Sequence, residues 1–276
     1  MIALRSIVFS ITVMLVAVPQ SVFAADRDRL EAFLEVTGFD VALESIRLSA
    51  RSAPQMLGLE AEDFGSEWTR LSGEVFETEV MHDLALDILE KTLSDDLLAH
   101  AAGFYASDLG QRLVVAENAS HMKEDGEAKD ESGAAILAGL SAIESPRVDY
   151  YKRMTQASDS AGVAVRAIQE IQVRFLMAAA GAGVIALQLE EPDLRELLAA
   201  DQDVLRDSIA EGAMVGAAYT YQSFSDAEVL EYAEALEHPK MREVYDLMNA
   251  VQYEIMANRF EALAVAMQDL QPSQEL

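Results

Sequence analysis

The chain has 276 residues, a formal net charge of −28 and no cysteine. Binding to nucleic acid requires clustered Lys and Arg to neutralise phosphates, and this acidic chain has no run of basic residues, so we exclude it. Without cysteine there are no disulfides, no thiolate chemistry and no lipid anchor on an N-terminal cysteine. A chain of this length can bury enough apolar surface to fold without such links.

Residues 1–24 have the pattern of a cleavable signal peptide. Arg5 provides the positive start, residues 7–18 are apolar, and Val22-Phe23-Ala24 matches the small-x-Ala site of a signal peptidase. The apolar run is shorter than the roughly 20 residues of a membrane-spanning helix. We expect cleavage after Ala24 or after Ala25, giving a periplasmic mature protein with no stable membrane span. The alternative is an uncleaved anchor.

The mature chain shows helical periodicity from its start, and residues 25–122 are expected to form a first helical module. A helix face at 30–34 ends near Gly38, a second helix ends by Pro54, and a loop holds Gly58 and Gly65. The next apolar positions recur at intervals of three and four, which predicts a single helix. They are Trp68, Leu71, Val75, Phe76, Val80, Leu84 and Ile88.

A helix start occurs twice, 131 positions apart. Ser94-Asp95 opens one segment and Ser225-Asp226 opens another, each with a good N-cap and an acid in the first turn. The same offset places Asn118-Ala119 on Asn249-Ala250. This self-similarity indicates an internal duplication. Two unrelated helical hairpins with similar caps are the alternative.

Residues 123–147 are predicted to be a linker with a short helix near 136–143, and 148–268 to be a second, diverged helical module. Its uncharged run 175–187 has the length of a buried core helix. Glu191-Pro192-Asp193 marks another helix start. The last helix should bury one face, formed by Met241, Val244, Met248, Val251 and Ile255, before a polar tail at 269–276. The predicted fold is all-α, with two tandem modules that pack with or without pseudo-symmetry.

Residues 104–112 read FYASDLGQR. With the Ser94 cap and the start at 34–38, this stretch resembles a bacterial envelope family, the domain-of-unknown-function family two-zero-five-nine. Its pattern is FY-x-S-x-x-G-x-[KR] at a helix–helix corner. The resemblance covers about residues 28–121 and implies an all-helical exported module with no assigned activity. The second half departs from it, with 238–241 in place of 107–110.

The candidate motif corner consists of Phe104, Tyr105, Ser107, Gly110 and Arg112. In a structural interpretation the two aromatic rings pack between helices, Ser107 caps the next helix and Gly110 permits close helix approach. In a functional interpretation Tyr105, Ser107 and Arg112 form part of a binding groove. Both interpretations stay open.

The sequence predicts no catalytic residue, no cofactor and no metal site. His82, His100, His121 and His238 fall in no zinc-binding pattern. Glu117 and His121 could share a helix face, but zinc normally takes three or four ligands. The pair is better explained as part of a solvated acidic helix.

Three functions remain. The first is an exported, non-catalytic protein that binds or scaffolds a periplasmic protein or a small apolar ligand in a groove between the modules. The second is a hydrolase-type enzyme on an envelope substrate, using Tyr105, His82 or His100. The third is a structural protein held at the membrane by residues 175–187. A homodimer is compatible with each.

Overall fold

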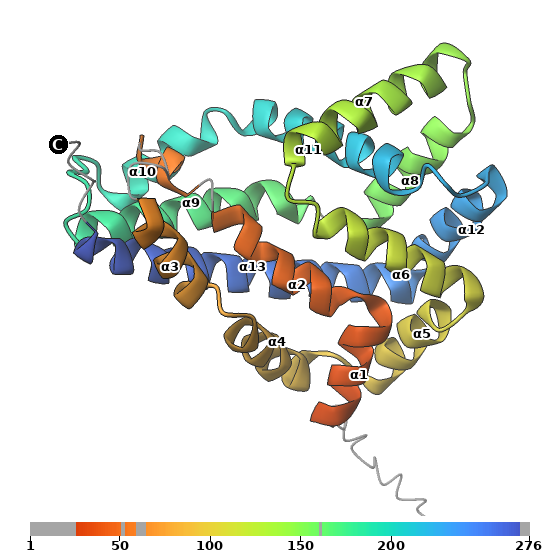
Figure 1. Ribbon diagram of the computed structural model, residues 1–276, viewed down its shortest axis with the longest axis horizontal. Helices are drawn as coiled ribbons and strands as arrows, with labels where there is room; N and C mark the ends of the chain where they lie inside the picture. The colour runs from red at the N-terminus through yellow and green to blue at the C-terminus, as the bar shows by residue number, and fades with distance from the viewer. Residues whose placement is uncertain (1–25, 51–52, 59–64, 160–161, 271–276) are drawn as a thin grey trace, which may run out of the picture.

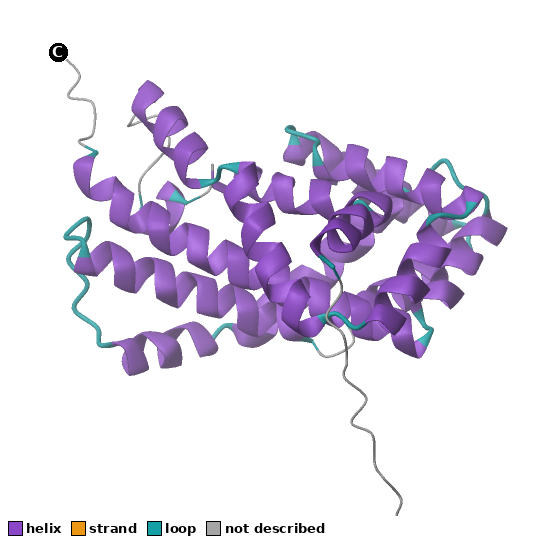
Figure 2. Cartoon of the chain, turned by 90° about the horizontal axis from the view of Figure 1, so that it is seen from below, coloured by secondary structure: helices purple, strands orange, loops and turns teal. Residues whose placement is uncertain are grey.

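The computed structural model describes residues 26–50, 53–58, 65–159 and 162–270. Our expectations for the signal peptide, its cleavage after Ala24 or Ala25, and most of the tail lie outside these residues. In the described part every regular element is a helix and there is no strand, which confirms the all-α fold (Figures 1 and 2). None of the helices in these ranges combines the length and the apolar character needed to cross a membrane.

The described residues of the first half form α1 to α6 and the short 3-10 helix η2. Gly38, with φ of 74°, lets the first helix turn directly into the second, as the sequence predicted. The elements are α1 (Arg27–Thr37), α2 (Phe39–Ser49), η2 (Pro54–Leu57), α3 (Gly65–Val75), α4 (Thr78–Thr92), α5 (Asp95–Tyr105) and α6 (Asp108–His121).

The single helix predicted over 68–88 is wrong, because α3 and α4 are separate helices. Phe76 and Glu77 lie between them, and the backbone of Glu77 is extended. The turn carries the Phe76 ring into the core, where it packs edge-on against Phe260 at 5.5 Å between ring centres. Burying a whole aromatic side chain outweighs one more turn of helix.

The linker predicted at 123–147 is mostly helical. Helix α7 (Gly126–Ala142) is capped by the Asp125 carboxylate, which accepts a hydrogen bond from the Ala128 amide. It packs on a helix of the second half, α11 (Gln202–Thr220). A β-carbon on Gly133 would lie 2.4 Å from the Val215 carbonyl oxygen, so the two backbones are almost in contact. The polar composition of 123–132 marks the exposed side of a helix.

Within its described residues the second half forms the α-helices α8 to α13 and a final 3-10 turn. The predicted start at 191–193 is confirmed, with Pro192 in the first turn. The core helix expected over 175–187 ends earlier, at Gly181, and Gly183 adopts φ of 76°. The elements are α8 (Arg147–Ser158), α9 (Val163–Gly181), α10 (Glu191–Ala199), α11, α12 (Asp226–Leu236), α13 (Pro239–Ala266) and η4 (Met267–Asp269).

Helix α13 is shared by both halves. It runs along most of the molecule in Figure 1 and packs on α9 and α8 of the second half, and on α3, α4 and α5 of the first. The apolar face predicted for it, from Met241 to Ile255, is fully buried. The two predicted modules therefore have one continuous core.

Several helix bounds and contacts recur in the two halves. Ser94 and Ser225 both cap 11-residue helices, α5 and α12, as predicted. The following helices, α6 and α13, also begin 131 positions apart. Helix α4 contacts α1, α2 and α13, and α11 contacts α8, α9 and α6, so each module's fourth helix touches the last helix of the other module.

Candidate ligand-binding cavity

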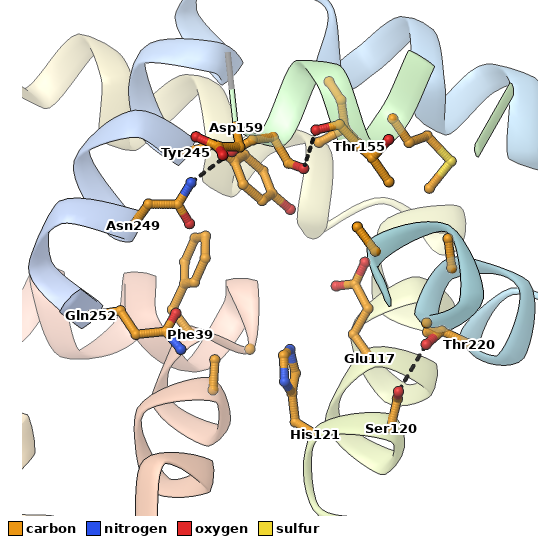
Figure 3. A pocket seen from close by; sticks show the side chains of 18 of the residues that line it. Phe39, Glu117, Ser120, His121, Thr155, Asp159, Thr220, Tyr245, Asn249 and Gln252 are labelled. Atoms are coloured by element: carbon orange, nitrogen blue, oxygen red, sulfur yellow. Dashed lines mark hydrogen bonds between the residues drawn. The ribbon is translucent and has the colours of Figure 1, made fainter. Parts of the chain in front are cut away.

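A cavity of about 410 Å³ lies between the two halves. Its wall comes from α1, α2 and α6 of the first half, from α8, α9, α11, α12 and α13 of the second, and from α7 (Figure 3). Small-molecule sites in proteins usually occupy about 300–1,000 Å³. The cavity is therefore large enough for a small organic ligand.

Glu117 of α6 is the central charged group of this cavity. Figure 3 shows its side chain and the Phe39 ring on opposite sides of the open space. The hydroxyls of Tyr221 and Tyr232 donate hydrogen bonds of 2.7 and 2.8 Å to Glu117 Oε1. Among the described residues, no donor reaches the second oxygen, Oε2. When Glu117 is ionised, one carboxylate oxygen is thus left as an acceptor for whatever enters the cavity.

Two more tyrosines extend this network. The Tyr105 and Tyr245 hydroxyls each lie 2.9 Å from the Tyr232 hydroxyl, and 2.5 Å from each other. Because Tyr232 donates its proton to Glu117, it accepts from Tyr105 or Tyr245. We call Glu117 and these four tyrosines the Glu-Tyr network. Its members come from α5, α6, α12, α13 and the residue after α11, so its geometry depends on the packing of both halves.

The surroundings of Glu117 shift its proton affinity. Burial raises the pKa of Glu117 to about 7, against the opposing effect of the hydrogen bonds from Tyr221 and Tyr232. Burial also raises the pKa of Tyr105 and of Tyr232, so these phenols stay protonated donors at neutral pH. Glu117 is consequently the group of the network that changes charge near neutral pH.

The remaining polar groups of the wall are mostly occupied. Asn249 Nδ2 donates to the Ser158 carbonyl at 2.7 Å, and the Thr220 hydroxyl donates to Ser120 Oγ at 2.8 Å. Asn118 differs, because its Oδ1 is buried without a hydrogen-bond partner. It sits against Gly38, where a β-carbon would come within 2.6 Å of that oxygen. Asn118 therefore keeps an enclosed, unpaired oxygen where α6 packs on Gly38.

The motif corner connects the first half to the second. Phe104 stacks on Tyr232 with 5.8 Å between ring centres. Ser107 caps α6 by accepting from the Gly110 amide at 3.1 Å. A β-carbon on Gly110 would lie 2.4 Å from the Phe104 carbonyl oxygen, so the corner requires glycine. Four of the five candidate residues thus have the packing and capping contacts of the structural interpretation, counting Tyr105, which is 1% exposed.

Arg112 points away from Tyr105. Its guanidinium forms a 2.6 Å ion pair with Glu228 and lies 5.6 Å from the centre of the Phe224 ring. It lines a shallow outer groove, whereas Tyr105 is inside the core. The structure does not bring Tyr105, Ser107 and Arg112 into one binding groove.

The histidines named for the hydrolase alternative contact residues outside the cavity. His82 Nε2 lies 3.2 Å from the Asp40 carbonyl oxygen, and His100 stacks on His238 with 4.2 Å between ring centres. Neither lines the cavity, and they do not meet Tyr105. Within the described ranges, no three His, Asp or Glu side chains are grouped as metal ligands would be.

Sequence reasoning missed the Glu-Tyr network. It placed Glu117 and His121 on one helix face, and both do line the cavity, but it read that face as solvated. The tyrosines were the available signal. Five of the eight tyrosines of the chain either line the cavity or join the network: Tyr105, Tyr221, Tyr232, Tyr245 and Tyr253.

A family model described as "Uncharacterized protein conserved in bacteria (DUF2059)" matches residues 79–138. This confirms the resemblance inferred from the sequence. The matched segment runs from α4 into α7 and includes the motif corner and Glu117. Comparison with curated proteins and with solved structures gave no match.

Proposed function

We propose that this chain is an exported, non-catalytic binding protein that holds a small, largely apolar ligand in the cavity between its two halves. The observation that carries this proposal is Glu117, a carboxylate with one free oxygen in a cavity walled mainly by apolar and aromatic side chains. A mostly apolar pocket with a few convergent polar groups is the usual form of a small-molecule site.

Export is part of the proposal and rests on the pattern of residues 1–24. Removal of this segment gives a mature N-terminus at Ala25 or Asp26. The intact mass of the protein recovered from a periplasmic extract tests both positions. A full-length mass, or recovery from the cytoplasm alone, would contradict export.

The two other functions have less support. A hydrolase using Tyr105, His82 or His100 would need these groups in one pocket, and each has a different set of neighbours. A membrane attachment through 175–187 would need that run to face lipid. Phe175 and Ala179 are instead fully buried in the core, and the helix ends at Gly181.

We also propose that the two halves arose by duplication. Helices α5 and α12 match in length and cap, and α4 and α11 share three corresponding contacts, although α11 also packs on α7. Asn118 of α6 and Asn249 of α13 lie 131 positions apart, and both line the cavity. Asn118 contacts Gly38 at the end of α1, and Asn249 binds the Ser158 carbonyl at the end of α8. His238 replaces Ser107 as the cap of the next helix, accepting from the Lys240 amide. In this view, the cavity formed where two copies of a module met.

The binding function is tested by filling the cavity. Gly216 lines it on α11, and a β-carbon there meets no atom within 4 Å, so Gly216→Leu places a side chain in free space. Gly212→Leu is the matched control, on the same helix, with equally open surroundings and outside the cavity wall.

Native mass spectrometry of the protein purified from a periplasmic extract is the measurement. We expect a bound small molecule on the wild type and on Gly212→Leu, and its loss from Gly216→Leu. Equal ligand content in all three proteins would place the ligand elsewhere and refute the proposal.

A further inference from the structure

We infer that the ligand is an organic cation, an ammonium group attached to an apolar body, with the ammonium bound at Glu117. This inference rests on the proposed binding function and goes further by naming the chemical class of the ligand. It depends on three features of the cavity wall: the free oxygen of Glu117, the charged side chains and the aromatic rings.

The free polar atom of the wall is an acceptor when Glu117 is ionised. Glu117 Oε2 has no donor among the described residues. A buried acceptor that loses water without gaining a donor costs about 1–3 kcal/mol. A ligand that supplies an N–H donor satisfies this oxygen, whereas a carboxylate ligand would place its own acceptors against it.

The charges of the wall favour a cation. Glu117 and Asp159 contribute two carboxylates, and Lys129 is the only Lys or Arg among the described residues that line the cavity. The Lys129 ammonium is engaged, since its Nζ donates to the Ser120 carbonyl at 3.1 Å. The Asp159 carboxylate accepts from the Val163 amide at the start of α9. Glu117 therefore remains as the carboxylate free to pair with a ligand, in a chain whose net charge of −28 draws cations toward it.

Aromatic rings line the same cavity. Phe39, Tyr221, Tyr232, Tyr245 and Tyr253 all line the cavity. Aromatic faces attract ammonium groups within about 6 Å of the ring centre, and this attraction strengthens when the cation is desolvated. A carboxylate among aromatic rings is suited to an amine that also carries hydrocarbon.

The test compares three probes of equal length that differ only in the head group: hexylammonium, hexanol and hexanoate. Binding to the ligand-free mature protein is measured by calorimetry at pH 8, where Glu117 is mostly ionised. We expect hexylammonium to bind at least tenfold more tightly than hexanol, and hexanoate to bind most weakly. Glu117→Gln should weaken hexylammonium at least tenfold and leave hexanol unchanged, while Gly216→Leu should weaken both.

A second measurement needs no variant. At pH 7 about half of the Glu117 side chains are protonated in the free protein, and a bound ammonium favours the carboxylate. Calorimetry in two buffers of different ionisation enthalpy should show that hexylammonium binding releases about half a proton. Hexanol binding should release none.

The possible failures are distinct. If hexanol or hexanoate binds as tightly as hexylammonium, or if Glu117→Gln binds hexylammonium as tightly as the wild type, the cation inference is wrong and the binding function stands. A neutral or anionic ligand on the protein purified from the periplasm would likewise refute the cation inference and leave the binding function in place. If the periplasmic protein carries no ligand and no probe binds, the proposed function fails as well.

Discussion

The Tyr232 hydroxyl of α12 donates a 2.8 Å hydrogen bond to Glu117 of α6, and this bond joins the second half of the chain to the first. The carboxylate of the cavity is thus oriented by a residue 115 positions away. The site exists only when the two halves are packed together, and the following predictions test the parts of this arrangement.

The raised pKa of Glu117 makes stability depend on pH. Its usual value is 4.5 and its value in the folded protein is about 7, so the unfolded chain ionises first. Stability from this group is complete below about pH 4.5 and is lost as the pH rises through about 7, a change of at most about 3 kcal/mol. The other titratable groups of the cavity wall are His121, Lys129, Asp159, Tyr221, Tyr232, Tyr245 and Tyr253.

Glu117→Gln removes this dependence. The wild type should lose about 2–3 kcal/mol of its free energy of unfolding between pH 5 and pH 8 because of Glu117, and the Glu117→Gln variant should not. Urea denaturation at the two pH values measures this difference. Glu231→Gln, on the exposed side of α12, is the control for the loss of one surface charge. A Glu117→Gln effect that is equal at both pH values would show that Glu117 is not buried as an acid.

The Glu-Tyr network should contribute to stability through its hydroxyls. Tyr232→Phe removes a donor to Glu117 and the partner of Tyr105 and Tyr245, and we expect it to destabilise the fold by about 1–3 kcal/mol. Tyr253→Phe is the matched control, because Tyr253 lines the same cavity and makes no hydrogen bond within the described residues. Thermal unfolding that shifts equally for both variants would contradict a coupled network.

The motif corner should not tolerate any side chain at Gly110. The new β-carbon of Gly110→Ala would lie 2.4 Å from the Phe104 carbonyl oxygen, a backbone atom that cannot rotate away as a side chain could. We expect destabilisation of about 1–3 kcal/mol. Gly103→Ala, in an open position on α5, should instead stabilise the helix by about 0.5–1 kcal/mol. Denaturant midpoints of the two variants must therefore move in opposite directions.

The packing of α7 on α11 is open to the same comparison. Gly133→Ala would drive a β-carbon to 2.4 Å from the Val215 carbonyl oxygen, so we expect a loss of about 1–3 kcal/mol. Gly139→Ala, on an open side of α7, should be neutral or stabilising. If Gly133→Ala is as stable as Gly139→Ala, residues 126–142 do not dock as described.

Local features of this fold could be read from the sequence. The caps at Ser94, Ser107 and Ser225, and the turn at Gly38, depend on side chains within three or four residues of the backbone they serve. The buried face of α13 follows from the spacing of its apolar residues. These predictions were confirmed because neighbouring residues alone decide them.

The errors all arise from packing between distant segments. The break at Phe76 depends on Phe260, and the docking of α7 depends on Val215. The Glu-Tyr network brings together helices spread from residue 105 to residue 245, and no local spacing encodes it. Glu117 therefore looked like one more acid on an acidic helix.

The sharing of α13 determines how this protein can be divided. The family match at 79–138 omits α1 and α13, which cover α4 and α5. A fragment of that length would expose the apolar faces of α4 and α5 to water. We therefore expect residues 79–138 alone to remain unfolded, and the whole protein to unfold in a single cooperative transition. On this expectation, the smallest part of the chain that folds by itself contains both halves and the α13 that they share.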